Sequence, residues 1–577
     1  MKDYMKIYQE WLTNPYFDEA TKAELKAIEG DENEIKERYM DLEFGTAGLR
    51  GIIGAGINRM NIYVVRRATQ GLANYIIKQG AADKGVAIAY DSRNMSPEFA
   101  MEAAMTLAAN GIKAYKFETL RPTPELSFAV RELGCVAGIN ITASHNPPEY
   151  NGYKVYWEDG AQFTPPHDKG VTEEVLAIED LSSVKTTDEA SAIAAGKYEV
   201  IGKEIDDKYI AQVKAQVVNQ KAIDEMQDQI RIVYTPLHGT GNIPARRVMK
   251  EIGFTHVYVV SEQELPDGNF PTVSYPNPEA KEAFELGLKL AKEKDADLVL
   301  ATDPDADRLG VYVKDAKSGE YIPLTGNMSG SLLCEYVLSQ KQAEGKIPAD
   351  GQVVKSIVST NLIDAVAKAY GAELIEVLTG FKWIGKQILK NETTGTGTYL
   401  FGMEESYGCL IGTYARDKDA ISATAALCEA AAYYKQKGMT LWDAMVAMYE
   451  KYGYYKDSVK SIGLSGIEGL AKIQSIMETL RNNTPAEVGG YKVVSARDYK
   501  LDTIRDMETG AVKPTGLPAS NVLYYDLEDG AWICVRPSGT EPKIKFYFGV
   551  KGISLEDADQ KEADLGAAVM AMVDKMM

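Results

Sequence analysis

The fold is decided by residues 86–117, which read VAIAYDSRNMSPEFAMEAAMTLAANGIKAYKF. The apolar run Val86–Ala89 is typical of a buried strand, and a polar loop follows at residues 90–93. A helix is expected from Pro97 to Ala109, ending before Gly111, because glycine adopts positive φ at little cost. A second strand is expected over residues 112–117. The unit is therefore strand, short polar loop, helix, glycine, strand.

The same unit recurs twice along the chain. The second copy runs from Ile230 to Val260 with Gly253 after its helix, and the third runs from Val353 to Leu378 with Gly371. Strands that alternate with helices predict parallel or mixed sheets. We therefore expect an α/β fold with three tandem mixed-sheet domains.

The predicted boundaries follow from these repeats and from composition. The three α/β domains are expected over residues 1–205, 206–325 and 326–455, the first with a helical extension over about 40 residues. Past residue 455 a polar segment precedes strands near 522–525 and 532–535, which predicts a smaller α+β domain over residues 456–577.

Composition excludes several classes of protein. The 577 residues are 45% hydrophobic and 25% charged, which is ordinary for a globular protein. A net charge of −20 argues against nucleic-acid binding but leaves anionic small substrates open, because a site can be locally basic. The five cysteines show no metal-ligand spacing, which predicts reduced core residues in a cytoplasmic protein. A signal peptide and an apolar run long enough to span a membrane are both missing from the sequence.

The hexapeptide Thr-Ala-Ser-His-Asn-Pro at residues 142–147 is a candidate for reactive chemistry. It follows an apolar run from Cys135 to Ile141 that predicts a buried strand. Ser144 would then sit on a tight turn with His145 beside it and Pro147 stiffening the exit. Ser, Asn and Pro also favour ordinary turns, so a displayed nucleophile and a plain turn both fit these residues.

Three aspartates in alternate positions, Asp303, Asp305 and Asp307, follow a predicted strand over residues 297–301. Carboxylates two residues apart in an extended chain point to the same side, and oxygen ligands suit Mg²⁺ or Ca²⁺. An EF-hand is excluded, because its glycine and glutamate positions hold Arg308 and Lys314. Apolar strands on both sides disfavour a solvated acidic turn. Three carboxylates leave room for a phosphate oxygen, as in phosphoryl-transfer sites.

Three further segments have polar side chains suited to a phosphorylated sugar. Residues 536–543, RPSGTEPK, offer hydroxyls and backbone N–H groups beside the cations Arg536, Lys543 and Lys545. A Walker loop is missing from the sequence, which argues against a P-loop kinase or ATPase. Residues 402–408, GMEESYG, suit vicinal hydroxyls or a polar hairpin turn. Residues 379–383, TGFKW, place a lysine and aromatic rings at the carboxyl end of a strand, where open sheets bind ligands.

Taken together, these motifs resemble those of the α-D-phosphohexomutase superfamily. The matching motifs are TASHNP, DPDADR, GMEES and RPSGTEP, one in each predicted domain and in the family's order. Residues 43–51, EFGTAGLRG, are similar to the phosphoglucomutase branch that also contains phosphopentomutases. The resemblance covers nearly the whole chain and implies three mixed α/β domains and a smaller C-terminal domain around a central cleft.

The resemblance also implies roles for the matching residues. Ser144 would be the phosphorylated serine, and Mg²⁺ would be bound by this phosphoserine with Asp303, Asp305 and Asp307. The residues implied to surround the reacting phosphate are Arg50, His145, Lys154 and Arg308. Residues 380–383 depart from relatives that have histidine there, which leaves the general acid/base open between His145, Lys154 and Lys382.

The other implied roles concern the substrate. Glu404 and Ser406 would contact sugar hydroxyls, and Gly380 with Lys382 would help to bind the sugar. The groups expected to hold the phosphate that does not react are Arg536, Ser538, Gly539, Thr540 and Lys545.

The resemblance implies a phosphosugar mutase, an intramolecular phosphotransferase of the isomerase class. Its expected reaction interconverts α-D-glucose 1-phosphate and glucose 6-phosphate through a phosphoserine and glucose 1,6-bisphosphate, which also serves as activator. One Mg²⁺ per chain is expected, with small sugar phosphates as partners, no nucleic acid, no membrane, and a monomer or weak homodimer. Mannose or pentose phosphates are alternative substrates. A serine-nucleophile sugar phosphatase and a non-catalytic sugar-phosphate sensor are the rival functions.

Overall fold

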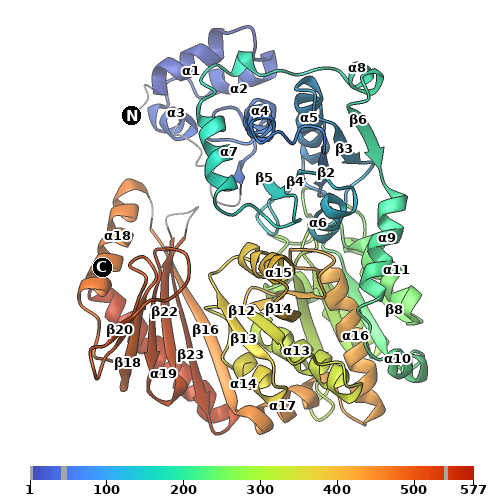
Figure 1. The fold of residues 1–577 in the computed structure, drawn as a ribbon, viewed down its shortest axis with the longest axis vertical. Coiled ribbons are helices and arrows are strands. Elements are labelled where there is room, and N and C mark those ends of the chain that lie inside the picture. The colour runs from blue at the N-terminus through green and yellow to red at the C-terminus, as the bar shows by residue number, and fades with distance from the viewer. Residues whose placement is uncertain (1–3, 40–47, 465, 539–542) are drawn as a thin grey trace. The chain divides into compact units, whose positions relative to one another are not determined.

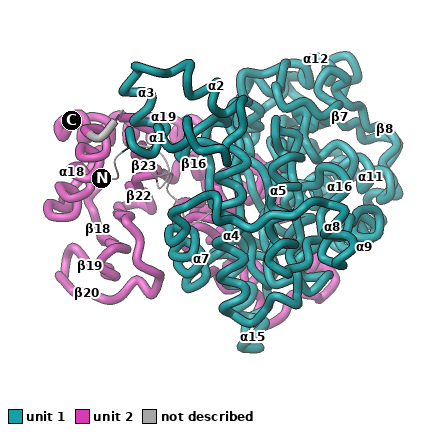
Figure 2. Tube along the Cα trace, turned by 90° about the horizontal axis from the view of Figure 1, so that it is seen from above, with its two compact units in different colours: residues 1–326, 381–402, 407–441 teal, residues 327–380, 403–406, 442–577 magenta. Residues whose placement is uncertain are grey.

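The computed structural model describes residues 4–39, 48–464, 466–538 and 543–577 (Figure 1). Contacts divide the chain into two compact units, drawn in different colours in Figure 2. The first unit holds residues 1–326, 381–402 and 407–441. The second unit holds residues 327–380, 403–406 and 442–577. The predicted α/β class with three sheets and a C-terminal domain is confirmed, whereas the domain boundaries stay a prediction.

Three helices form the expected N-terminal extension: α1 (Tyr4–Thr13), α2 (Glu19–Ala27) and α3 (Glu32–Tyr39). They are amphipathic, and their apolar side chains meet in an aromatic cluster around Trp11. Trp11 stacks on Phe17 with ring centroids 4.2 Å apart and meets Tyr63 edge-on at 5.7 Å. Because Tyr63 belongs to helix α4 (Ile62–Lys78), this cluster attaches the extension to the first α/β domain.

The first sheet is mixed and has the strand order β1-β5-β4-β2-β3-β6. Its strands are β1 (Leu49–Ile52), β2 (Val86–Tyr90), β3 (Ala114–Phe117), β4 (Ala137–Ile141), β5 (Tyr150–Trp157) and β6 (Tyr198–Ile201). Strand β2 is parallel to β3 and β4, whereas β5 is antiparallel to β4 and β1. Helices α5 (Ser96–Ala109) and α6 (Thr123–Glu132) pack on β2 and β4 (Figure 1). The loops at the carboxyl ends of β2 and β4 therefore lie side by side.

The second sheet has the order β11-β10-β9-β7-β8 and is also mixed. Its strands are β7 (Arg231–Thr235), β8 (His256–Val259), β9 (Leu298–Thr302), β10 (Leu309–Lys314) and β11 (Tyr321–Leu324). Strand β7 is parallel to β8 and β9, and β10 returns antiparallel to β9. Every residue of β9 is buried, so the turn between β9 and β10 starts from a rigid strand.

The third sheet consists of β12 (Gly351–Ser356), β13 (Glu373–Val377), β14 (Thr398–Glu404) and β15 (Gly408–Ile411). Within the second unit, β12 is parallel to β13, with Val353 opposite Leu374. Helix α14 (Leu362–Ala369) connects these two strands. The predicted unit is thus present three times, and the glycine after each helix has positive φ: 76° at Gly111, 126° at Gly253 and 69° at Gly371.

The C-terminal sheet is antiparallel and includes β16 (Tyr454–Gly463), β18 (Tyr491–Asp498), β21 (Leu523–Leu527), β22 (Trp532–Pro537) and β23 (Lys543–Gly552). The polar segment just past residue 455 forms most of β16, a strand that the sequence pattern did not predict. Strand β16 pairs with β23 over its full length and keeps its side chains half-buried or exposed. Its stability therefore comes from backbone pairing, which an apolar pattern does not reveal.

None of the helices in the described ranges combines the length and apolar character that a membrane crossing requires.

Asn61 is predicted to hold the start of α4 in place. Its Oδ1 accepts the N–H of Val64 at 3.0 Å, and its Nδ2 donates to the carbonyls of Gly54 and Gly56 at 2.9 and 2.8 Å. Asn61→Ala removes the cap and both bonds, so we expect a cost of about 2 kcal/mol and about 30-fold faster hydrogen exchange in the first turn of α4.

The matched control is Asp188→Ala, which removes an exposed cap from helix α8 (Glu189–Ala194). Its exchange effect should stay within α8 and be smaller. Unchanged exchange in α4 of the Asn61 variant would contradict this assignment.

Candidate active site

Ser144 lies on the loop that follows β4, as the sequence predicts. Its backbone has φ of 52°, a conformation that is rare for a residue with a side chain. The Oγ–H donates to Asp303 Oδ2 at 2.8 Å, and Oγ lies 3.1 Å from Nδ1 of His145. The hydroxyl of the first domain thus contacts a carboxylate of the second, within one compact unit.

Asp303, Asp305 and Asp307 converge on the turn between β9 and β10. All three are buried, and each offers a carboxylate oxygen within 4.8 Å of the others. Oδ1 of Asp303 accepts the N–H groups of Asp307 and Arg308 at 3.1 and 3.0 Å, which folds the turn around this carboxylate. The predicted convergence of the three aspartates is therefore confirmed.

Two lysines lie against the aspartates. Lys154 on β5 contacts Asp305 Oδ2 at 2.8 Å, and Lys418 contacts Asp307 Oδ2 at 3.2 Å. Thr123, at the start of α6, also donates to Asp305 Oδ2 at 2.8 Å. Each of these side chains is at least nine-tenths buried. Low local polarity strengthens both the attraction to the lysines and the repulsion among the carboxylates.

The aspartates shift one another's pKa in opposite directions. Burial, and then the charges of the other two aspartates, raises the pKa of Asp303 well above its usual range. Burial and the Asp305 charge also raise the pKa of Asp307. Burial alone would raise the pKa of Asp305, but the charge and hydrogen bond of Lys154, together with hydrogen bonds from Asp303 and Thr123, hold this pKa below its usual range. A bound cation would therefore favour the ionised forms of Asp303 and Asp307.

The donor set fits a hard divalent cation. Oδ1 of Asp305 and Oδ1 of Asp307 are buried and accept no hydrogen bond from the described residues. A buried carboxylate oxygen without a partner is costly, and an oxygen-only cluster is the type of site that binds Mg²⁺ or Ca²⁺. Asp303, Asp305 and Asp307 would hold this ion. The Ser144 hydroxyl, bonded to Asp303, is placed to offer a further oxygen.

Two arginines lie around the serine loop. Arg50 on β1 donates from Nη1 to Asn146 Oδ1 at 3.1 Å, and Arg308 donates from Nη1 to Glu279 Oε1 at 2.8 Å. Burial, and then the charges of Arg308 and Arg50, lowers the pKa of His145 well below its usual range. This shift favours the neutral form of His145, which is the form that can accept a proton.

Sequence reasoning missed Lys418, although a signal was present. It belongs to the run Arg416-Asp417-Lys418-Asp419, whose four charged side chains are all buried. Lys418 Nζ lies 3.1 Å from Asp417 Oδ1, and the hydroxyl of Tyr156 donates to Asp417 Oδ2 at 2.9 Å. Charged residues are rarely buried unless they are paired, so four in a row before an apolar helix indicate a paired cluster.

In the second unit, Gly380 and Glu404 lie together. Glu404 ends β14 and is buried, and its Oε1 accepts the N–H of Gly380 at 2.7 Å. Ser406 lies half-buried in the short segment between β14 and β15, whereas Glu405 Oε2 accepts the hydroxyl of Ser356 at 2.9 Å. The segment is therefore a short connection between two strands. The expected contacts of Glu404 and Ser406 with sugar hydroxyls stay a prediction.

The C-terminal cations are neighbours across two strands. Arg536 on β22 lies directly opposite Lys545 on β23, and both are half-buried. The N–H of Ser538 donates to the carbonyl of Lys543 at 2.6 Å. The predicted residues Gly539 and Thr540 lie outside the described residues, as do residues 43–47 of the N-terminal motif.

Lys382 is the first residue of helix α15 (Lys382–Thr394) in the first unit. Its ammonium lies 5.6 Å from the centre of the Trp383 ring. Burial lowers its pKa, and the charge of Lys386 lowers it further, whereas Asp168 opposes the shift. A lysine with a lowered pKa is suited to proton transfer, but its role in catalysis stays a prediction.

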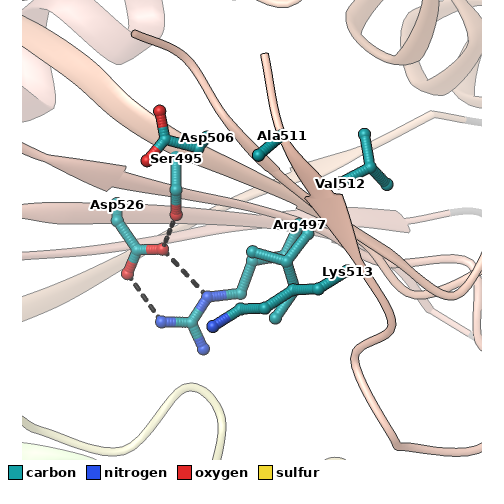
Figure 3. Close-up of a pocket in the computed structure, with 8 residues that line it drawn as sticks. Ser495, Arg497, Asp506, Ala511, Val512, Lys513 and Asp526 are labelled. Atoms are coloured by element: carbon teal, nitrogen blue, oxygen red, sulfur yellow. Dashed lines mark hydrogen bonds and ion pairs between the residues drawn. The ribbon is translucent and has the colours of Figure 1, made fainter. Parts of the chain in front are cut away.

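A pocket of about 510 Å³ on the C-terminal sheet is a weaker candidate for a ligand site. Figure 3 shows that Arg497 and Ser495 both point at Asp526. Arg497 donates to both oxygens of Asp526, at 2.9 and 2.7 Å, and to Glu376 Oε2 at 3.0 Å. Carboxylates thus already hold the guanidinium of this pocket.

Four family models match the chain in order. They describe phosphoglucomutase/phosphomannomutase α/β/α domain I at residues 41–182, domain II at 207–319, domain III at 325–452, and the C-terminal domain at 478–563.

Curated relatives and a solved structure agree with these matches. The chain is 37% identical over 520 residues to a phosphoglucomutase of Staphylococcus saprophyticus, covering 90% of this chain and 92% of the relative. It is 36% identical over 561 residues to a phosphoglucomutase of Staphylococcus haemolyticus, covering 97% and 98%. The open form of parafusin, a Paramecium phosphoglucomutase, superposes with a TM-score of 0.67 at 18% identity, covering 94% and 95%, which shows a shared fold.

Mg²⁺ binding is predicted to depend on the aspartate cluster. Asp307→Asn keeps the shape of the side chain but removes a negative charge, so we expect Mg²⁺ affinity measured by calorimetry to fall at least about tenfold. Asp315→Asn, just beyond the far end of β10, is the matched control and should bind Mg²⁺ like the unmodified protein. Equal affinity in the Asp307 and Asp315 variants would rule out the cluster as the site.

Proposed function

This chain belongs to the phosphoglucomutase/phosphomannomutase family, and we propose that it interconverts α-D-glucose 1-phosphate and glucose 6-phosphate through a phosphorylated Ser144. The family makes it a phosphosugar mutase, an enzyme of the isomerase class. The observation that carries the proposal is the 2.8 Å hydrogen bond from Ser144 to Asp303 inside a cluster of three buried carboxylates. A serine that exchanges phosphate beside a bound cation requires this juxtaposition.

In the proposed reaction the phosphoryl group moves between Ser144 and the sugar. The P–O bond to Ser144 Oγ breaks as a bond forms to a free hydroxyl of the sugar monophosphate, whose proton passes to a base of the protein. The resulting glucose 1,6-bisphosphate reorients, so that its other phosphate faces Ser144, and returns that phosphoryl group to Ser144. The three aspartates would hold Mg²⁺, and the bound ion would neutralise negative charge on the phosphoryl group during its transfer.

The residues around Ser144 can position the reactants and move the proton. Arg50 and Arg308 are cations beside the loop and can bind phosphate oxygens. His145, whose lowered pKa favours the neutral form, lies 3.1 Å from Ser144 Oγ, so it is a candidate proton acceptor. The other two candidates for the general acid/base are Lys154, which donates a hydrogen bond to Asp305, and Lys382, whose pKa is lowered.

The remaining proposed roles concern the rest of the substrate. Glu404 and Ser406 are proposed to contact sugar hydroxyls, with Gly380 holding Glu404 in place. The proposed holders of the second phosphate are Arg536, Ser538, Gly539, Thr540 and Lys545. The paired positions of Arg536 and Lys545 support this role, because two adjacent cations suit a dianion.

Glucose is the proposed sugar, because relatives at 36–37% identity over most of the chain are phosphoglucomutases. Mannose and pentose phosphates remain alternatives, since Glu404 and Ser406 do not exclude an axial hydroxyl. We further propose one Mg²⁺ per chain, activation by glucose 1,6-bisphosphate, a cytoplasmic location, and a monomer or weak homodimer.

Ser144→Ala is predicted to abolish turnover while the fold stays intact. The substitution removes the oxygen that carries the phosphoryl group, so we expect kcat to fall by at least about 10⁴-fold in a coupled glucose 6-phosphate assay. Ser183→Ala, at an exposed serine of the same domain, is the control and should keep full activity. Full turnover in the Ser144 variant would refute the phosphoserine mechanism.

The sugar and the reaction class are tested by one comparison. Glucose, mannose and ribose 1-phosphates are assayed with and without glucose 1,6-bisphosphate, and Ser144 phosphorylation is followed by intact mass. We expect the fastest turnover with glucose 1-phosphate, stimulation by the bisphosphate, and one phosphate on the protein. Release of inorganic phosphate would indicate the phosphatase, and an unphosphorylated protein after bisphosphate treatment would indicate the sensor.

A further inference from the structure

Arg93 lies beneath the Ser144 loop, in the polar loop that follows β2. Its side chain is 1% exposed, yet it reaches the backbone of the neighbouring loop. Nη2 donates to the carbonyls of Ser144, at 2.6 Å, and Asn146. Nη1 donates to the carbonyls of Pro147 and Tyr150 at 2.8 and 3.0 Å. One guanidinium thus holds four carbonyls of the segment that carries the reactive serine.

Asp91 completes a second connection to the same serine. Its carboxylate lies 3.4 Å from Nε of Arg93, and its Oδ2 accepts the hydroxyl of Thr142 at 2.6 Å. The Thr142 oxygen in turn accepts the N–H of Ser144 at 2.9 Å. Both backbone polar groups of Ser144 are therefore bonded, directly or through Thr142, to one buried ion pair. A residue at φ of 52° keeps that conformation only when its surroundings fix it.

The second domain closes this arrangement from the other side, within the first unit. The ring of Phe270, which is fully buried, lies with its centre 5.1 Å from the guanidinium carbon of Arg93. Asn94 donates from Nδ2 to Asn269 Oδ1 at 3.0 Å. Water is thereby kept from Arg93, which strengthens its bonds to the four carbonyls.

We propose that Arg93 is a positioning residue for phosphoryl transfer, which fixes the Ser144 hydroxyl against the aspartate cluster without touching the substrate. The inference rests on the proposed function. Lysine cannot replace the guanidinium, because its ammonium is a single point and cannot serve carbonyls that two separate nitrogens reach. Displacing a reacting group by about 1 Å can cost about 100-fold in rate, so the proposal predicts a large effect on kcat and a small effect on binding.

The test compares Arg93→Lys with Arg66→Lys. Arg66 on α4 forms two hydrogen bonds with Glu102, at 2.6 and 3.0 Å, and has no place in the proposed site. We expect Arg93→Lys to lower kcat by about 100-fold with KM within about threefold, and to slow the phosphorylation of Ser144 by glucose 1,6-bisphosphate equally. Arg66→Lys should leave both rates within about twofold. A folded Arg93→Lys enzyme whose kcat falls less than about tenfold would overturn the proposal.

If Arg93→Lys does not fold, a second pair of variants tests the positioning role. Thr142→Val keeps the shape of the buried side chain but breaks the connection from Asp91 to the Ser144 N–H, and Thr142→Ser preserves it. We expect Thr142→Val to lose at least about tenfold in kcat with little change in KM, and Thr142→Ser to recover most of that loss. Equal kcat in the two variants would overturn the proposal.

The unmodified protein separates this inference from the proposed function. If it lacks mutase turnover and bisphosphate does not phosphorylate Ser144, the proposed function fails. If it is active and the folded Arg93→Lys variant is equally active, only the positioning role fails.

Discussion

The mutual repulsion of three buried carboxylates is the constraint on which the active-site region depends. Asp303, Asp305 and Asp307 are buried with carboxylate oxygens within 4.8 Å of one another, so their charges repel. Cations must come from elsewhere, and they come from residues distant in sequence, Lys154 on β5 and Lys418. The first α/β domain, the β9–β10 turn and the segment around Lys418 therefore all contribute charge to this one cluster.

Ser144 is subject to a related constraint, which concerns geometry instead of charge. Ser144 adopts a backbone conformation that costs free energy, and the Asp91–Arg93 pair below it offsets that cost through bonds to both of its backbone polar groups. The pair is buried and therefore expensive to desolvate, so stability alone does not explain its presence. Its presence is explained by the need to hold one hydroxyl 2.8 Å from Asp303.

Local sequence predicted the repeated architecture and the chemistry of the individual motifs, and the contacts made across long sequence separations escaped it. Glycines after helices marked all three strand–helix units, because positive φ is a local requirement. The aspartates could be predicted since alternate positions share a face. Thr123 and Arg93 could not be assigned to the site, because their partners lie more than 50 residues away. The charged run around Lys418 indicated a paired cluster but not its distant partner Asp307. Strand β16 was missed for a similar reason, since its partner β23 is about 80 residues further on.

Burial distinguishes Ser144 and the aspartate cluster from the side chains proposed to hold the second phosphate. Ser144, Lys154 and the three aspartates are more than nine-tenths buried. Ser406, Arg536, Ser538 and Lys545 are half-buried and keep more rotamer freedom. In the proposed reaction a bisphosphate presents either of its two phosphates to the same serine. The groups at the point of transfer must then be identical for both halves of the cycle, whereas the groups that hold the sugar and the other phosphate must accept two orientations of the ligand. Buried charges at the point of transfer and the half-buried cations Arg536 and Lys545 at the other phosphate meet these opposite requirements.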